Sequence, residues 1–401
     1  MQNGEPMNML VLASYFKGER FMRQAAARGV RVHLLTIEKL LGEAWPRDIL
    51  TEVYAQNNDN TLQQTINTVS YLARNLRIDR IVPLDDFDVE TAATLREHLR
   101  IPGMGDTTAR HFRDKLAMRV KCREEGIPVP DFVHVLNYDA IRDFIRRVPA
   151  PWMFKPRSEA SATGIIKVES EGQLWDVINS KGDRQSYFLL EKYLPGDVYH
   201  VDSIISERKV VFQAVHRYVK PPFNVAHGGG IFCTMTVERG SADDKALREL
   251  NTTVLTKLNL VRGVSHVEFI KRHDDGKFYM LESAARVGGA HIAEVVEASS
   301  GVNLWAEWAN IEVDGNTKPY QLPKTHEEYA GIALTLARQE RPDLSAYNDP
   351  EIVYRAPEKN HAGLIVRAKT HQRVKELMDS YQERFTREFF ASMPAKEKPE
   401  H

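Results

Sequence analysis

The sequence predicts an α/β amino-terminal domain with a parallel sheet, followed by two α+β subdomains with antiparallel sheets. Three observations support this fold class: strand and helix patterns alternate over the first hundred residues, a β-rich section follows, and two long strands flank a turn near residue 275. At 401 residues the chain is long enough for two or three domains with buried cores. We place an amino-terminal domain, a linker helix, a small lid subdomain, a larger subdomain and a disordered tail at residues 1–105, 106–126, 127–192, 193–392 and 393–401.

The composition is that of an ordinary globular protein with balanced charge. The 54 Lys and Arg residues offset 55 Asp and Glu residues to a net charge of −1, which gives no indication of a nucleic-acid partner. No stretch approaches the roughly 18 apolar residues of a membrane span, and the first residues lack the segments of a signal peptide. The two cysteines, Cys122 and Cys233, are typical of a reducing compartment and exclude a cysteine-based zinc site. We therefore expect a cytoplasmic protein with no membrane partner.

Repeated strand–helix units predict the amino-terminal domain. Such crossovers imply a parallel, doubly wound sheet that binds ligands near the carboxyl ends of its strands. A dinucleotide-binding turn is missing, because the loop after the first strand contains only Gly18. The acidic run Asp85-Asp86-Phe87-Asp88 has two interpretations, capping of the next helix or a surface that faces a ligand. The predicted strands are 9–13, 32–36 and 80–84, and the predicted helices are 19–28, 62–76 and 89–99.

The middle of the chain predicts a helix at 114–125 and then a small α+β module. Lys155 lies in the apolar strand 152–156, where an ammonium group needs an anionic partner. Loop 157–164 is rich in small residues and is able to fold over phosphate groups. Lys115, in a charged helix, is by itself typical of a solvated lysine. Further strands are predicted at 164–168, 187–191, 197–206, 210–219, 263–272 and 277–283, and further helices at 171–179, 243–258 and 291–299.

The strands at 263–272 and 277–283 form a predicted hairpin that carries two glutamates. If Asp274-Asp275-Gly276 is a three-residue loop, His273 pairs with Lys277 and Glu268 lies opposite Glu282. Carboxylates that face each other at a Cβ separation of about 4.5–5.5 Å repel unless one is protonated or a cation lies between them, and Mg²⁺ or Mn²⁺ would serve as that cation. The alternative is a register slipped by one residue, with one glutamate in solvent. Arg286 follows, either as an ion-pair partner or as a clamp for a carboxylate or phosphate.

Taken in order, several short segments resemble the ATP-grasp superfamily over about residues 8–390. They are Asp114-Lys115-Leu-Ala-Met-Arg119 with Gly126-Ile-Pro-Val-Pro130, Phe154-Lys155-Pro156, Glu191-Lys-Tyr-Leu-Pro-Gly196, and Glu268-Phe269 with Leu281-Glu282 and Arg286. The chain is most similar to the carboxylate–amine ligase branch, typified by L-amino-acid ligases, which is related to biotin carboxylase and glycinamide ribonucleotide synthetase. The resemblance implies that ATP phosphorylates a carboxylate and that an amine then attacks the acyl phosphate.

The resemblance also implies a role for each matched residue. Lys115 and Lys155 would hold the ATP phosphates under a loop that contains Ser161 and Thr163, and Arg286 would stabilise the acyl phosphate. Glu268 and Glu282 would bind the metal ion, Mg²⁺ or Mn²⁺. Apart from the resemblance, His266 and His227 are candidates to assist deprotonation of the amine, and the alternative for each is a core or solvated histidine. The adenine hinge would be Glu191, Lys192, Tyr193 and Leu194, the ribose contact Asp197, and the phosphate-side residues His200 and Gln213.

Two departures from the family pattern bear on function. Ala284 stands where the family has a metal-binding Asn, which leaves the number of metal ions open. Gly288-Gly-Ala-His291 replaces the Gln-Val-Glu-His of biotin carboxylases, whose Glu deprotonates bicarbonate. We therefore expect an ATP-dependent ligase that joins a carboxylic acid to an amine, with amino acids as substrates and with a homodimer as a possible assembly. The alternatives are a biotin-dependent carboxylase-like enzyme and a non-catalytic ATP-binding module.

Overall fold

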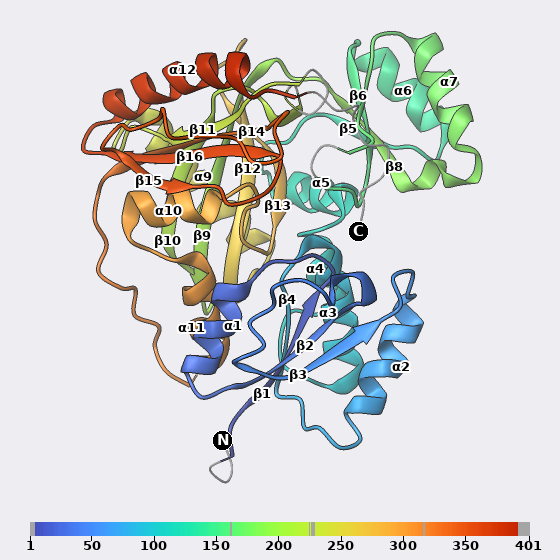
Figure 1. Cartoon of the computed structure of the whole chain (residues 1–401). Helices are drawn as coiled ribbons and strands as arrows, with labels where there is room; N and C mark the ends of the chain where they lie inside the picture. Colours follow the sequence, from blue (N-terminus) through green and yellow to red (C-terminus); the bar gives the residue numbers. More distant parts are fainter. Residues whose placement is uncertain (1–4, 161–162, 224, 226–228, 316, 392–401) are drawn as a thin grey trace.

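The computed structural model describes residues 5–160, 163–223, 225, 229–315 and 317–391. It contains a parallel sheet of four strands, a small antiparallel sheet of four strands and a large antiparallel sheet of eight strands (Figure 1). The predicted fold class is therefore confirmed. The predicted tail at 393–401 lies outside the described residues, and the domain boundaries remain predictions.

The amino-terminal sheet has the strand order β3-β2-β1-β4, and its strands are parallel. Buried apolar residues of β1, such as Val11, pack against α1 on one face, while Leu10 and Leu12 pack toward α2 and α3 on the other. The edge strand β3 was not predicted, because polar residues interrupt its apolar pattern and every residue is at least partly exposed. The elements are β1 (Asn8–Ala13), α1 (Glu19–Ala27), β2 (Arg31–Ile37), β3 (Leu50–Gln56), α2 (Leu62–Leu72), β4 (Arg80–Pro83) and α3 (Asp86–Leu99).

Two linker helices lead to the small lid subdomain, which stands to one side of the large sheet (Figure 1). Its sheet has the order β5-β8-β6-β7, and two helices cover the apolar face that contains Phe154 and Leu190. The elements are α4 (Asp106–Arg110), α5 (Lys115–Glu124), β5 (Phe132–His134), α6 (Tyr138–Arg147), β6 (Trp152–Pro156), β7 (Ile166–Val168), α7 (Glu171–Lys181) and β8 (Phe188–Lys192).

The large sheet has the order β13-β12-β9-β10-β11-β14-β16-β15. Its helices lie on both faces, and α12 lies on the outer face at the upper left of Figure 1. The strands are β9 (Gly196–Ser206), β10 (Lys209–Tyr218), β11 (Phe232–Thr236), β12 (Gly263–Arg272), β13 (Phe278–Ala284), β14 (Tyr329–Leu336), β15 (Ile352–Arg355) and β16 (His361–Ala368). The helices are α9 (Ala242–Lys257), α10 (Ile292–Ser300), α11 (Leu304–Asp314) and α12 (His371–Glu388).

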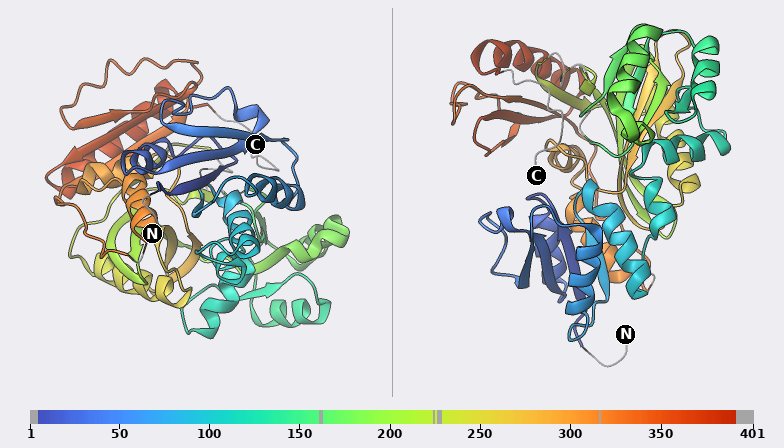
Figure 2. Two further views of the ribbon diagram at one scale, coloured as in Figure 1. Left: turned by 90° about the horizontal axis from the view of Figure 1, so that it is seen from below. Right: turned by 90° about the vertical axis from the view of Figure 1, so that its right-hand side faces the viewer.

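Strand alternation divides the side chains of β9 between two environments. Tyr199 and Val201 pack in the apolar core under α9, whereas His200 and Asp202 point to the opposite face. The amino-terminal domain packs near this second face, because Ile204 of β9 shares an apolar cluster with Phe21 of α1 and Trp308 of α11, whose rings are in contact. Figure 2 shows the amino-terminal domain beside the large subdomain. Among the described helices, none combines the length and apolar character that a membrane crossing requires.

Candidate active site

Two glutamates face each other at the edge of the large sheet. Glu268 on β12 pairs with Glu282 on β13, as the hairpin pattern predicted. The predicted three-residue loop is wrong, however, because Arg272 donates its backbone N–H to the Lys277 carbonyl over 3.0 Å and closes the strands one residue earlier than the expected pair at His273. The strands next to the loop therefore have the slipped register, whereas Glu268 and Glu282 have the predicted facing register.

A β-bulge accounts for this difference. Next to the Glu268–Glu282 pair, Phe269 pairs with Met280, so Leu281 is an extra residue on β13. The longer loop and the bulge each shift the register by one residue, in opposite directions. The bulge therefore restores the facing position of the two carboxylates.

Lys115, the first residue of α5, lies against Glu282. Its Nζ donates to a Glu282 carboxylate oxygen over 2.8 Å and to the Glu159 carbonyl over 2.6 Å. Its backbone N–H donates to the Arg157 carbonyl over 2.8 Å. Lys115 is only 5% exposed, so its interpretation as a solvated lysine is wrong. These contacts bring the loop that follows β6 onto the acidic pair.

Lys155 on β6 has the anionic partner that its apolar strand requires, and that partner is Glu191 on β8. Arg119, one helical turn beyond Lys115, donates Nε to the other Glu191 oxygen over 2.9 Å. Burial raises the pKa of Glu191, but Arg119 and Lys155 outweigh it and hold the pKa below its usual value. Both carboxylate oxygens thus bind cations, and a contact between Glu191 and adenine stays a prediction.

The hinge after β8 leads from the lid to the large sheet. Lys192 and Tyr193 donate their backbone N–H groups to the Asp131 and Pro151 carbonyls over 2.8 and 3.1 Å. The buried Leu194 joins an apolar cluster at the hinge, which is suited to the flat ring of a nucleotide base. That cluster consists of Leu194, Val198, Tyr218 and Ile270, with Phe232, Tyr279 and Leu281 packed against it.

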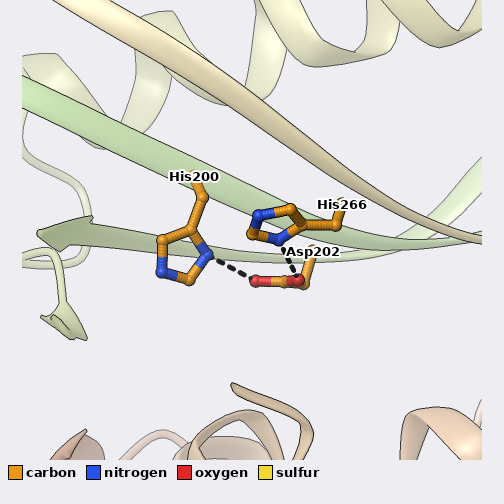
Figure 3. Close-up of side chains that lie close together, drawn as sticks. All are labelled: His200, Asp202 and His266. Carbon is orange, nitrogen blue, oxygen red and sulfur yellow. Dashed lines mark hydrogen bonds and ion pairs between the residues drawn. The ribbon is translucent and has the colours of Figure 1, made fainter. Parts of the chain in front are cut away.

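Beside Glu268, a buried carboxylate organises two imidazole rings. Asp202 accepts from Nδ1 of His200 over 2.7 Å and from Nδ1 of His266 over 2.9 Å (Figure 3). Burial lowers the pKa of His200 to about 4. Burial also lowers the pKa of His266, but Asp202 and Glu268 outweigh it and raise the pKa to about 9. A protonated imidazole accepts no proton from an amine. The predicted role of His266 as a base therefore requires that its ring first lose a proton.

The side chain of Arg286 contacts the amino-terminal domain. Its Nε donates to Asp86 at the start of α3 over 2.7 Å, and its second terminal nitrogen donates to the same oxygen. The neighbouring Asp85 caps α3 by accepting from the Phe87 N–H over 3.1 Å and also pairs with Lys17. The acidic run therefore has the predicted capping role, and Asp86 also faces the candidate site.

Two candidate residues lie on the opposite face of the sheet from this group. Gln213 accepts from Asn251 of α9 over 2.7 Å, three residues from His216 and hence on the face away from His200. Asp197 pairs with Arg217 over 3.0 Å on the same α9-facing side. Both remain predictions that the geometry does not bring together with the other residues. Ser161 and His227 lie outside the described residues, whereas Thr163 is described at the end of the loop.

Three residues of this region were not predicted. Arg119 belongs to a quoted motif and lies four residues after Lys115, a spacing that places both side chains on one face of α5. Asp202 follows His200 by two residues in an apolar strand, which is the signal of a shared polar face. Tyr218 donates its hydroxyl proton to Glu268 over 2.9 Å, and only the strand pairing reveals this contact.

The donor set fits both ATP and a divalent ion. Lys115, Lys155 and Arg286 supply positive charge for phosphate groups, and Glu268 with Glu282 supplies the oxygen ligands that Mg²⁺ prefers. In the described part of the chain, His200, Asp202 and His266 also form a set of three potential ligands within 4.8 Å of one another. Their N–O contacts of 2.7 and 2.9 Å are hydrogen bonds in the present arrangement.

Comparison with known proteins agrees with this geometry, although no family model matches the chain. It is 26% identical over 242 residues to an L-arginine-specific L-amino acid ligase of Bacillus subtilis, a match that covers 59% of this chain and 58% of that protein. The chain thus matches less than two thirds of that relative's length.

Solved structures extend the similarity over nearly the whole fold. The L-amino acid ligase of Bacillus licheniformis superimposes with a TM-score of 0.74 at 15% identity, covering 97% of this chain and 100% of that one. The biotin carboxylase domain of a Hydrogenobacter thermophilus 2-oxoglutarate carboxylase, in complex with MgADP and bicarbonate, gives a TM-score of 0.71 at 15% identity, over 93% of this chain and 88% of that one. At this identity the likeness establishes the fold.

Proposed function

We propose that this chain, which has the ATP-grasp fold, is an ATP-dependent ligase that joins a carboxylic acid to an amine. The reaction forms an amide or peptide bond through an acyl phosphate and releases ADP and phosphate. One observation supports this function above the others: α5 places Lys115 on Glu282 and Arg119 on Glu191, and Glu191 also pairs with Lys155 of β6, so this helix links both candidate phosphate-binding lysines.

The residues of the site would bind different parts of the nucleotide and its metal ion. Lys115 and Lys155 would hold the phosphates of ATP, and the hinge apolar cluster around Leu194 would hold the base. Mg²⁺ or Mn²⁺, held by Glu268 and Glu282, would neutralise charge on the phosphate oxygens.

The transfer step brings two anions together, because a carboxylate attacks the terminal phosphoryl group. Arg286, fixed at Asp86, would stabilise charge on the acyl phosphate. The loop after β6 already reaches Lys115 through the Glu159 carbonyl, so it would keep water from the reactive intermediate. The amine then attacks the acyl carbon and phosphate leaves.

A carboxylase-like function is less well supported. The stretch from Gly288 to His291 carries no carboxylate to deprotonate bicarbonate. A non-catalytic ATP-binding role is disfavoured by the retention of both lysines, both glutamates and Arg286 in one region. Amino acids are the proposed acid and amine substrates. Both buried cysteines are free, in keeping with a cytoplasmic location, and a homodimer remains a prediction.

The test is ATP-dependent ligation with pairs of amino acids, followed by ADP release and mass detection of the dipeptide. We expect product with the parent chain, and loss of about 100-fold or more in kcat for Glu282→Gln and Lys155→Ala. Glu340→Gln is the matched control, because Glu340 forms an exposed ion pair with Lys359. ATP turnover at the parent rate in both site variants would contradict the site assignment, and nucleotide binding without turnover on any acid would favour the non-catalytic alternative.

A further inference from the structure

The metal site proposed above has an imidazole at its border. On β12, His266 and Glu268 are two residues apart and point to the same face, and His266 lies opposite Ala284 of β13. His266 Nε2 is 3.6 Å from the nearer Glu268 carboxylate oxygen and 3.5 Å from the Tyr218 hydroxyl. These separations are longer than good hydrogen bonds, but they are close to the separation of two neighbouring ligands of one metal ion.

The opposite side of the ring is fixed. His266 Nδ1 contacts Asp202 over 2.9 Å, and the other Asp202 oxygen is held by His200 over 2.7 Å (Figure 3). Gly288 closes the same side, because a Cβ atom there would lie 3.0 Å from His266 Nδ1 and 3.1 Å from Asp202. A carboxylate that binds one ring nitrogen and leaves the other for an ion is the usual environment of a metal-binding histidine.

From this geometry we propose that His266 is a ligand of the divalent ion, binding through Nε2 beside Glu268, and that Asp202 is the residue that positions its ring. The inference rests on the proposed function, since it assumes the ion at Glu268 and Glu282. Ala284 lies opposite His266, on β13, and its side chain has no donor atom. The imidazole is therefore the available ligand at this pair of the hairpin.

The proposal predicts which ions bind best. Mg²⁺ prefers an all-oxygen set, whereas Mn²⁺ and Co²⁺ accept imidazole nitrogen readily. We therefore expect the chain to bind Mn²⁺ more tightly than Mg²⁺ in the presence of a non-hydrolysable ATP analogue. His216 offers a matched comparison, because it is buried in the same group of rings but its Nδ1 is 3.6 Å from Asp202, and strand β9 with His200 lies between it and Glu268.

The decisive experiment is pulsed EPR of Mn²⁺ on the full chain without an affinity tag, with the ATP analogue present. The parent chain should show coupling of Mn²⁺ to one histidine nitrogen, which changes isotope pattern when histidine is labelled with ¹⁵N. His266→Asn should lose this coupling and weaken Mn²⁺ binding about 10- to 100-fold. Asp202→Asn should keep the coupling and weaken binding to a similar extent, and His216→Asn should behave as the parent.

The outcomes separate the two proposals. If the parent binds Mn²⁺ without nitrogen coupling and Glu268→Gln abolishes binding, the proposed metal site stands and the role of His266 is wrong. If the parent binds no Mn²⁺ with or without nucleotide, both are wrong. The spectrum of the ¹⁵N-labelled parent decides the question even if a variant fails to fold. Retained coupling in a folded His266→Asn protein would also overturn the inference.

Discussion

Asp86 and Arg286 form a buried ion pair between the amino-terminal domain and the segment that follows β13, the strand that carries Glu282. Two guanidinium nitrogens donate to one Asp86 oxygen, while the third donates to the Val287 carbonyl over 2.8 Å. Burial raises the pKa of Asp86, but Arg286, Arg113 and Lys17 outweigh it and hold the pKa below its usual value. The guanidinium group is therefore held in one place by a charged carboxylate of another domain.

Asp86→Asn should lower kcat about 10- to 100-fold with little change in KM for ATP, because Arg286 loses its fixed position near the reacting groups. Asp86→Glu should recover part of the loss. Steady-state kinetics would measure this, with Glu297→Gln as the control, since Glu297 forms another ion pair between the domains, with Arg20. If Asp86→Asn lowered the rate by the same factor in an Arg286→Lys background, Asp86 would not act through Arg286.

Glu191→Gln should destabilise the fold by about 3–5 kcal/mol, because it leaves the buried Arg119 and Lys155 without their carboxylate. Lys155→Met should cost much less stability, since Arg119 still neutralises Glu191. Urea unfolding monitored by circular dichroism would compare the two variants. Equal stability losses would show that the Glu191–Lys155 pair, and not the Glu191–Arg119 pair, carries the structural role.

Asp88 should make stability depend on pH in the acid range. Burial raises its pKa from 3.8 to about 6 in the fold, although Ser14 donates to it from both N–H and hydroxyl. The folded state then binds more protons than the unfolded state between these values, so stability falls as pH rises through this range. Asp88→Asn should remove this fall and gain about 2–3 kcal/mol relative to the parent between about pH 3.5 and pH 7, measured by urea unfolding. A difference that does not change with pH would contradict the prediction.

Gly196→Ala should weaken the junction between the lid and the large sheet. A Cβ atom at this position would lie 2.4 Å from the Lys271 carbonyl oxygen, which is part of the β9–β12 ladder. We expect a loss of about 1–3 kcal/mol in unfolding free energy from this overlap. Gly172→Ala in α7 is the matched control, because its Cβ has open space. Equal stability of the two variants would mean that the strand moves aside at no cost.

Sequence patterns predicted the elements that repeat regularly. The strand–helix units of the amino-terminal domain and the facing position of Glu268 and Glu282 are confirmed. Sequence patterns did not predict the contacts that depend on tertiary packing. Asp86 and Arg286 are far apart in the sequence, and nothing in either segment specifies the other.

Other differences concern single positions in strands and loops. Gln213 and Asp197 were chosen by resemblance; strand alternation places them on the face covered by α9, and their roles stay predictions. The polar edge strand β3 was missed because its pattern of exposure is irregular. The loop after Arg272 was predicted one residue too short, since several loop lengths satisfy the same turn residues.

The extra residue at Leu281 makes the position of the acidic pair independent of the length of the turn. Because β13 takes up the offset beside Glu282, the loop between Arg272 and Lys277 can gain or lose a residue while the strands keep their register and Glu268 stays opposite Glu282. Changes in length at the tip of this hairpin should therefore leave the geometry of the two carboxylates unaltered.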